Sequence, residues 1–309
     1  MNSTEKIQQL QELIQGTLTP LINHDYWLLE VPFYPNVGDC LIWQGELDFL
    51  RTLPYKRKGM SSYESPIPDK ISKDDLILLQ GGGNFGDLWL LPQQYRLDVI
   101  KKYPDNRIII LPQSVWFENN DNFKKCAEFL SSFPNVIICA RDKYSYNLLT
   151  ENLKNKILLV PDMAFCINTR RWEIPLKRNK SLLLKREDRE QKQYQEIEKL
   201  VANKEITVCD WLTFSENSWQ KNWLRRTKKY LPVINPWYAE HFYLPYMVNS
   251  GVQLIGSHDK IYSTRLHAAI LSILLGKAED LTWFDNSYGK NSSFYETWLS
   301  DLDGITFIK

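Results

Sequence analysis

The chain has 309 residues, about twice the usual length of a domain, so two domains or one large domain are expected. Its 38 basic and 37 acidic side chains almost balance, and no window gathers Lys and Arg among aromatic residues, so nucleic acid is not expected as a partner. The five cysteines are scattered without CxxC spacing, which favours neither a disulfide framework nor a zinc site. We expect no metal and no cofactor.

The N-terminus carries no recognisable targeting segment. Residues 1–16 are polar and amphipathic, unlike a signal peptide, and no apolar run is long enough to span a bilayer. We therefore expect a cytoplasmic protein, and peripheral contact with the inner face of the membrane stays open. Eleven Trp and sixteen Tyr are many for this length; they serve either as core residues or as surfaces that hold sugar rings.

The first half of the chain alternates apolar strands with helical segments. An amphipathic helix is expected over residues 4–16. The expected strands are 26–31, 76–80, 107–111, 135–140 and 156–160, with an edge strand near 56–60. The expected helices are 40–50, with Asp39 as the N-cap, and 89–103, 121–131 and 144–152. This alternation predicts a parallel, doubly wound α/β sheet.

Several of these strands end in residue types that can bind a ligand. The strand at 76–80 runs into Gly81-Gly82-Gly83-Asn84, and glycines at the carboxyl end of a buried strand let the backbone approach a ligand closely. A tight turn would explain the same glycines, and neither GxGxxG nor a P-loop is present. Later strands end near Ser114, Arg141 and Asp162, which we expect on the same rim.

Residues 168–180 break the alternation and are expected to link two Rossmann-like domains that face a cleft. The predicted domains are 1–167 and 168–290, with residues 291–309 packing back on the first. Strands are expected at 181–185, 206–211, 261–264 and 281–284. Helices are expected within 188–202, at 216–230, within 236–256, after residue 264 and at 294–302.

The segment 261–277 is the sharpest signal in the chain. A short strand, Ile261–Thr264, is followed by a turn and an apolar helix that ends at Gly276. Arg265 and His267 fall in the first helical turn, where unpaired N–H groups and the helix dipole favour an anion. The alternative is that Arg265 pairs with a carboxylate and His267 is a hydrogen-bonded core histidine.

The expected strand and helix ends collect cations and carboxylates together. The cations are Arg141, Arg265, His267 and Lys290, and the carboxylates are Asp39, Asp87 and Asp162. Several cations without a metal-ligand cluster suit a small anion that carries both a phosphate and a carboxylate, held by bidentate arginine contacts.

Seven short segments in order resemble the polysaccharide pyruvyl transferase family and together cover roughly residues 30–300. They are Asn36-Val37-Gly38-Asp39, Gly81-Gly82-Gly83-Asn84-Phe85-Gly86-Asp87, Pro112-Gln113-Ser114, Ala140-Arg141-Asp142, Pro161-Asp162, Arg265-Leu266-His267 and Tyr288-Gly289-Lys290. The chain departs from the family in its short second half, in Pro112 where Gly is common, and in the aromatic stretch 211–243.

The resemblance implies a GT-B-like fold and transfer of pyruvate from phosphoenolpyruvate to two hydroxyls of a sugar, as a cyclic ketal. It also implies a role in the synthesis of capsular polysaccharide, exopolysaccharide or cell-wall glycan, with an acceptor that could be lipid-linked. By matching motif, Arg141, Arg265 and His267 would hold the donor. The rival hypotheses are a GT-B glycosyltransferase that uses a nucleotide sugar and a non-catalytic glycan-binding subunit.

The chemistry of such a transfer assigns further roles. His267 could protonate the methylene carbon as a general acid, and Asp39, or else Asp87, could accept the proton of the sugar hydroxyl. Arg141 and Arg265 would position phosphate and carboxylate. The substrate-binding candidates are Arg141, Arg265, His267, Lys290, Gly81, Gly82, Gly83, Asn84 and Ser114. Asp39 as an N-cap, Lys290 as a surface lysine and the glycines as a turn are the structural alternatives.

Overall fold

The computed structural model describes residues 1–174, 180–186, 192–202, 205–211 and 236–309. The helix expected at 216–230 lies outside these residues. Two compact units are distinguished. Unit 1 consists of Met1–Gln9, Tyr34–Gln44 and Asn168–Lys309, and unit 2 of Leu10–Phe33 and Gly45–Ile167. The grouping of residues 1–9 and 34–44 with the second half of the chain differs from the division expected from the sequence.

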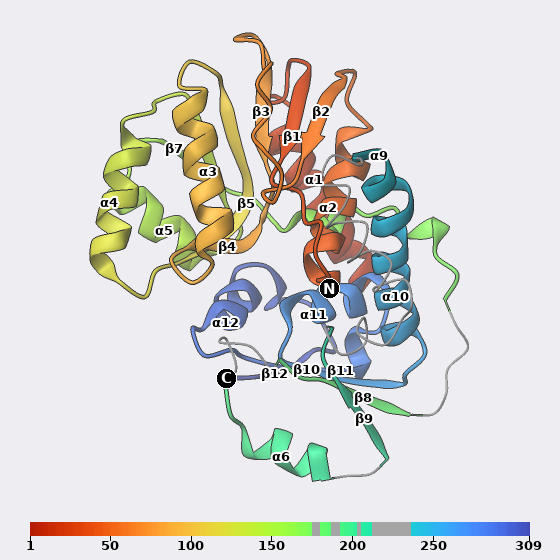
Figure 1. Cartoon of the computed structure of the whole chain (residues 1–309). Coiled ribbons are helices and arrows are strands. Elements are labelled where there is room, and N and C mark those ends of the chain that lie inside the picture. The colour runs from red at the N-terminus through yellow and green to blue at the C-terminus, as the bar shows by residue number, and fades with distance from the viewer. Residues whose placement is uncertain (175–179, 187–191, 203–204, 212–235) are drawn as a thin grey trace. The chain divides into compact units, whose positions relative to one another are not determined.

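Unit 2 is built on a parallel sheet of seven strands in the order β2-β1-β3-β5-β6-β7, with β4 paired to β5. Figure 1 shows β1, β2 and β3 side by side. The strands are β1 (Tyr26–Leu29), β2 (Arg57–Ser61), β3 (Leu76–Leu79), β4 (Gly82–Gly86), β5 (Ile108–Trp116), β6 (Val136–Ala140) and β7 (Lys156–Leu159). The helices of the first half are α1 (Ser3–Leu18), α2 (Val37–Leu50), α3 (Leu90–Lys102), α4 (Asn120–Ser131) and α5 (Lys143–Asn152).

The core of unit 2 follows from the apolar runs in its strands. Ile77 and Leu79 of β3 pack with Ile108 and Ile110 of β5, and Val99 of α3 joins the same cluster. Side chains that alternate across a strand reach both faces of the sheet, so uninterrupted apolar runs require helices on both faces. The buried runs therefore fix this sheet as the interior layer of its unit.

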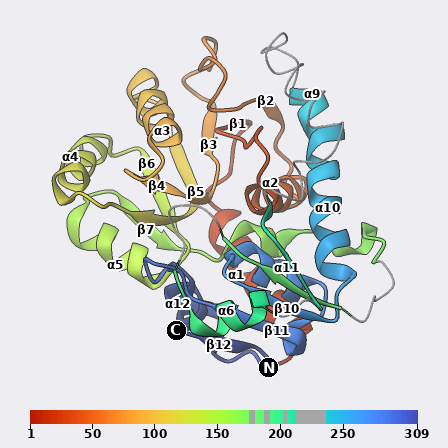
Figure 2. The same ribbon diagram turned by 60° about the horizontal axis from the view of Figure 1, so that its bottom comes forward.

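Unit 1 holds a second parallel sheet, in the order β12-β11-β10-β8-β9. Figure 2 shows β10, β11 and β12 side by side. The strands are β8 (Ser181–Leu184), β9 (Ile206–Cys209), β10 (Lys260–Ser263), β11 (Leu281–Phe284) and β12 (Thr306–Ile308). Its helices are α6 (Gln195–Ala202), α9 (Pro236–Tyr238), α10 (Leu244–Gly256), α11 (Leu266–Leu274) and α12 (Lys290–Phe294), with π-helical segments at Ala239–Tyr243 and Tyr295–Leu299. Short 3-10 turns lie at Met163–Cys166, Thr169–Arg171 and Ala278–Asp280.

Both sheets change winding direction at a defined pair of strands. In unit 2, β1 is flanked by β2 on one side and β3 on the other; in unit 1, β8 is flanked by β9 and β10. Ligands of open α/β sheets bind outside the carboxyl ends of strands at such switch points. Gly81 follows β3 and Arg265 follows β10, so each switch point carries a motif identified in the sequence.

The predicted α/β class with two Rossmann-like domains is confirmed by these two parallel sheets. Their arrangement about a cleft stays a prediction. No helix in the described part of the chain is both long and apolar enough to cross a membrane.

The C-terminal segment contacts both the N-terminus and the second half of the chain. Residues 291–309 were expected to pack on the predicted domain 1–167, and Asp303 and Asp301 form ion pairs with Met1 and Lys6 of that range. In addition, β12 extends the sheet of unit 1 by pairing with β11. The physical reason is an aromatic cluster: the Phe307 ring lies 5.2 Å from Trp283 and 4.5 Å from Tyr295, centroid to centroid. The N-terminal residues that meet this segment, Met1 and Lys6, belong to unit 1 as well.

Candidate functional site

Two of the sequence motifs meet within unit 1. His267 is the second residue of α11, and Gly38 is the second residue of α2. A Cβ atom placed on Gly38 would lie 2.7 Å from Nδ1 and 3.0 Å from Cγ of His267. Real Cβ contacts are essentially never this short, so only glycine lets the imidazole lie against the first turn of α2. The two motifs are therefore in contact.

The start of α2 is organised by Asn36 rather than by Asp39. The helix begins at Val37, and Asn36 Oδ1 accepts hydrogen bonds from the backbone N–H of Gly38 (2.9 Å) and of Asp39 (3.4 Å). The expectation that Asp39 is the N-cap was wrong, because the helix starts at Val37, three residues before the expected Cys40, and Asn36 supplies the capping oxygen. Asp39 Oδ2 accepts from Asn36 Nδ2 and from Tyr34 OH, both at 2.7 Å. These donors orient a half-buried carboxylate within the first turn.

Arg265 is held by a carboxylate that the sequence analysis missed. It follows β10, and its Nε donates to Asp210 Oδ1 at 2.7 Å while its Nη2 donates to Asp210 Oδ2. Both residues are buried, and Asp210 directly follows β9. The alternative in which Arg265 pairs with a carboxylate is therefore confirmed. A bidentate pair fixes the plane of the guanidinium.

Arg141 lies in a separate cluster within unit 2. Its Nε donates to Ser114 Oγ (2.9 Å) and its Nη1 to Asp162 Oδ2 (2.6 Å), and Ser114 Oγ donates to Asp142 Oδ2 (2.6 Å). The structure thus brings together three of the predicted rim residues. Arg141 is only 1% exposed, and its charge is balanced by Asp162. The geometry favours a role in joining the carboxyl ends of β5, β6 and β7.

The glycine segment forms a strand rather than the ligand-facing loop that was expected. Gly82–Gly86 is β4, and it pairs with β5. Gly86 has φ +146°, and a Cβ there would lie 1.6 Å from the carbonyl oxygen of Trp116. Glycine is required at this position because the neighbouring backbone of β5 comes too close for a side chain. Gly82 and Gly83 lie in the same strand.

Asn84 projects from this strand into a buried polar network. Its Oδ1 accepts from Arg96 Nη2 (2.7 Å) and from Gln113 Nε2 (3.2 Å). Arg96 is fully buried and forms an ion pair of 2.5 Å with Glu30, which directly follows β1 and has φ +70°. Arg96 and Glu30 were not predicted, because nothing in the sequence separates a buried charged pair from two surface charges.

A buried acid supports the backbone after β3. Glu46 is 0% exposed, and its Oε1 accepts from the backbone N–H of Gly81 at 2.8 Å. Burial raises the pKa of Glu46 well above its ordinary value, and the nearby charges of Asp162 and Glu30 act in the same direction. The raised pKa favours the protonated form of Glu46. It was not among the predicted site residues.

Asp87, the second candidate for the base, is used as an anchor. It accepts from the backbone N–H groups of Glu118 (2.7 Å) and Asn119 (3.0 Å) and from Asn122 Nδ2 (3.0 Å) at the start of α4. Partial burial acts to raise the pKa of Asp87, but these hydrogen bonds outweigh it and lower the pKa below its ordinary value. A carboxylate with a lowered pKa is a weaker proton acceptor, which disfavours Asp87 as the base.

Lys290 lies in unit 1 at the first position of α12. It follows Gly289, whose φ of +67° suits glycine, and its backbone N–H donates to Asn286 Oδ1 at 2.8 Å. Its side chain is half-buried. Among the described residues, no group of three or more His, Cys, Asp or Glu side chains is placed to hold a metal ion.

Comparison with known proteins identifies the family to which the chain belongs. The family model described as polysaccharide pyruvyl transferase matches residues 36–278, from the N-cap of α2 to the residue that begins the turn after α11. The chain belongs to the polysaccharide pyruvyl transferase family. The match contains the Gly38–His267 contact, the Arg265–Asp210 pair and the Arg141 cluster, whereas Lys290 lies beyond it.

The chain is also similar to individual relatives, two of which carry a pyruvyl transferase name. EpsO of Bacillus subtilis (strain 168), which is provisionally named a pyruvyl transferase, is 32% identical over 330 aligned positions that cover 100% of this chain and 96% of EpsO. Pyruvyl transferase 1 of Schizosaccharomyces pombe is 28% identical, over 91% of this chain and 72% of its own length. General stress protein 30 of Bacillus subtilis is 28% identical over 91% of this chain and 80% of its length.

The fold also has a solved counterpart. A crystal structure of a Klebsiella pneumoniae protein of uncharacterised function superimposes with a TM-score of 0.60 at 18% identity, over 100% of this chain and 99% of that one. At this identity the likeness shows the fold alone.

Proposed function

We propose that this member of the family transfers pyruvate from phosphoenolpyruvate to two hydroxyls of one sugar in a surface-polysaccharide precursor, forming a cyclic ketal and releasing phosphate. The observation that carries the proposal is the contact of His267 with Gly38, beside the oriented guanidinium of Arg265 in the same unit. A precursor assembled on a lipid carrier would be a suitable acceptor.

The reaction needs two additions to the same carbon. In the first step a sugar hydroxyl attacks the central carbon of phosphoenolpyruvate, loses its proton to a base, and the terminal methylene carbon gains a proton and becomes a methyl group. In the second step the bond from that central carbon to the phosphate oxygen breaks, phosphate leaves, and a second hydroxyl forms the new carbon–oxygen bond while losing its proton. Two hydroxyls and one phosphoenolpyruvate thus give one ketal and one phosphate.

The residues of unit 1 supply the groups that these steps require. We assign His267 as the acid that protonates the methylene carbon, because an imidazolium both donates a proton and offsets the charge of the leaving phosphate. Arg265, already fixed in plane by Asp210, would bind phosphate or carboxylate. Asp39 is the carboxylate proposed to accept a hydroxyl proton. Arg141 is proposed to position the strand ends of unit 2 rather than to touch the donor.

A thermal-shift experiment with phosphoenolpyruvate, pyruvate and UDP tests the donor. A ligand that binds only the folded state raises the melting temperature by mass action. We expect a shift with phosphoenolpyruvate that is lost in His267→Ala and kept in His241→Ala, an exposed histidine of unit 1 that stacks on Trp237. A shift with UDP alone would favour the nucleotide-sugar glycosyltransferase and overturn the proposal.

The role of Arg265 must be tested with a single and a double variant, because removing Arg265 alone leaves the buried carboxylate of Asp210 without its counter-charge. Arg265→Ala alone is expected to lower stability for that reason. The double variant Arg265→Ala/Asp210→Ala removes both charges. Its stability should therefore be higher than that of Arg265→Ala, whereas donor binding should stay lost. Phosphate release in the presence of phosphoenolpyruvate and a panel of p-nitrophenyl glycosides would then identify the acceptor. Recovery of donor binding together with the fold would exclude Arg265 as a donor ligand.

A further inference from the structure

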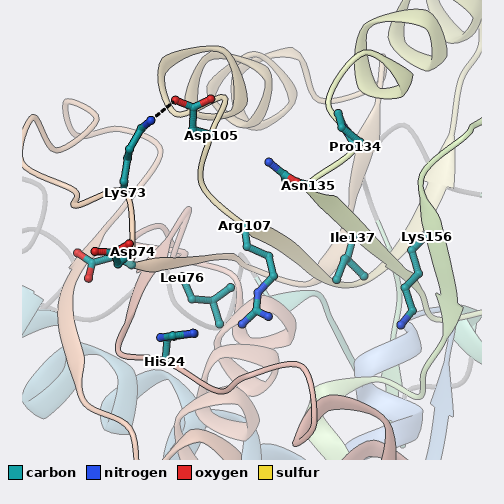
Figure 3. A pocket seen from close by; sticks show the side chains of 11 residues that line it. His24, Lys73, Asp74, Leu76, Asp105, Arg107, Pro134, Asn135, Ile137 and Lys156 are labelled. Atoms are coloured by element: carbon teal, nitrogen blue, oxygen red, sulfur yellow. Dashed lines mark ion pairs between the residues drawn. The ribbon is translucent and has the colours of Figure 1, made fainter.

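A cavity of about 540 Å³ opens in unit 2 at the amino ends of its strands, the edge of the sheet opposite to Gly81, Ser114 and Arg141. Leu76 and Lys156 are the first residues of β3 and β7, and Arg107 and Asn135 directly precede β5 and β6. Pockets that hold small ligands in proteins measure roughly 300–1,000 Å³. The residues that line it are His24, Lys73, Asp74, Asp75, Leu76, Asp105, Arg107, Pro134, Asn135, Ile137 and Lys156 (Figure 3).

Two of the three lining carboxylates are already matched by cations. Asp105 pairs with Lys73 at 2.9 Å. Asp75 pairs with Lys58 at 2.5 Å, and it also accepts from Trp27 Nε1 and from the backbone N–H of Ser72, both at 3.1 Å. Lys58 does not line the cavity. It therefore neutralises the charge of Asp75 while leaving the lining cations unpaired with Asp75. Asp74 contributes the one remaining carboxylate, exposed at the rim.

The cations Arg107 and Lys156 lack such partners. Within the described ranges of the chain neither forms an ion pair, and Arg107 donates only to the neutral amide oxygen of Asn23. In Figure 3 the guanidinium of Arg107 lies between the side chains of His24 and Lys156. Burial lowers the pKa of Arg107 from its ordinary value, because the charged guanidinium has lost part of its hydration. An anion in the cavity would compensate that loss of hydration.

Three lining cations face three lining carboxylates, and Lys58 neutralises one of the latter from outside. The charges of the lining residues alone therefore cancel, and among the described residues Arg107 and Lys156 are the lining cations that form no ion pair. Leu76, Pro134 and Ile137 add apolar surface to the same cavity. A guanidinium beside apolar walls suits a ligand with a compact anionic head and an apolar body, because bidentate contact fixes the head and burial stabilises the rest.

We propose that this cavity binds a small organic anion whose phosphate or carboxylate group is held by Arg107 and Lys156 and whose apolar part rests on Pro134 and Ile137. The site is separate from the motifs at the carboxyl ends of the strands, and it does not depend on the transferase reaction proposed above.

Titration calorimetry on the full chain tests the site. The probes are AMP, which carries a phosphate on a flat body, citrate, which carries carboxylates, and inorganic phosphate, which is a head without a body. The variants are Arg107→Gln and Lys156→Gln, and the matched control is Arg51→Gln, an exposed arginine of unit 2 that pairs with Asp48 outside the cavity. A melting curve for each variant shows that the fold is kept.

We expect AMP or citrate to bind the wild type and Arg51→Gln with one site per chain, and to bind Arg107→Gln about tenfold more weakly, the loss that one charge-assisted hydrogen bond of roughly 1.4 kcal/mol represents. Lys156→Gln should weaken binding less, since its amine is exposed. Absence of binding to the wild type up to millimolar probe overturns the proposal. So does binding that both cavity variants retain, or that only Arg265→Ala/Asp210→Ala abolishes, because the anion would then occupy the catalytic motifs.

Discussion

Gly38 is the residue that allows the His267 ring to lie against the first turn of α2: a Cβ atom at position 38 would come within 2.7 Å of Nδ1. The contact joins two motifs that are far apart in the chain. A methyl group introduced at position 38 would have two separate effects. It would change the stability of helix α2, and it would displace the imidazole of His267.

Gly38→Ala is therefore expected to impair transfer far more than folding. Alanine favours a helix over glycine by about 0.5–1 kcal/mol, which offsets part of the steric cost, whereas the displaced imidazole should lower kcat at least tenfold. Phosphate-release kinetics and a melting curve measure the two effects. Gly16→Ala in α1, where a Cβ would meet no atom within 4 Å, is the control and should gain stability with unchanged activity. Equal activity in both variants would contradict the role of the contact.

Asp210→Ala should destabilise the protein by about 3–5 kcal/mol, since it leaves the buried Arg265 guanidinium without its carboxylate. The double variant with Arg265→Ala should be more stable than Asp210→Ala alone. Urea unfolding of both variants and the wild type gives the coupling between the two residues. Additive losses would show that the pair contributes no interaction energy.

Glu46→Gln tests the buried acid through its pH dependence. The pKa of Glu46 is raised in the folded state, so the folded protein binds a proton that the unfolded chain releases above its ordinary carboxyl pKa. Wild-type stability should therefore fall relative to Glu46→Gln as pH rises from about 4.5 toward the raised value, and the two should converge at lower pH. Denaturant unfolding between pH 4 and 9 measures the difference. Glu128→Gln, an exposed position on α4, should show no such trend.

Asp39→Asn and Asp87→Asn distinguish the two carboxylates proposed as the base. If Asp39 accepts the hydroxyl proton, its amide should lower kcat by about 10²–10⁴-fold, whereas Asp87→Asn should stay within a few-fold. Asp87 instead contributes to stability. Because its folded-state pKa is lowered, that contribution is present above its ordinary pKa and is lost as pH falls below it. A larger loss of kcat in Asp87→Asn would reverse the assignment.

Regular apolar strands and the bounds of some helices could be predicted closely from the sequence. The expected strand 281–284 coincides with β11, and the helix expected at 89–103 is α3 within one residue at each end. β4 was missed because a strand of three glycines, one asparagine and one phenylalanine has no apolar alternation to detect. β12 was missed because three partly exposed residues carry too little burial to stand out.

The candidate site was predictable only in its motif residues. Arg265 and His267 stand out because a cation in an apolar helix requires a reason. The supporting residues do not stand out: Asp210, the partner of Arg265, is one strand-end carboxylate among several. Glu46 and Arg96, which support Gly81 and Asn84 in unit 2, look like the polar side of helices. Whether such a charge faces solvent or a buried partner depends on tertiary pairing, which a local sequence pattern does not encode.

The carboxylate of Asp210 also determines how Arg265 acts at a distance. A guanidinium that already carries its counter-charge projects little field into bulk solvent, so it cannot draw an anionic substrate from several Debye lengths away. Capture of phosphoenolpyruvate would then depend on the fit made after encounter. The association rate should accordingly change little with ionic strength, in contrast to enzymes that steer charged substrates by exposed cations.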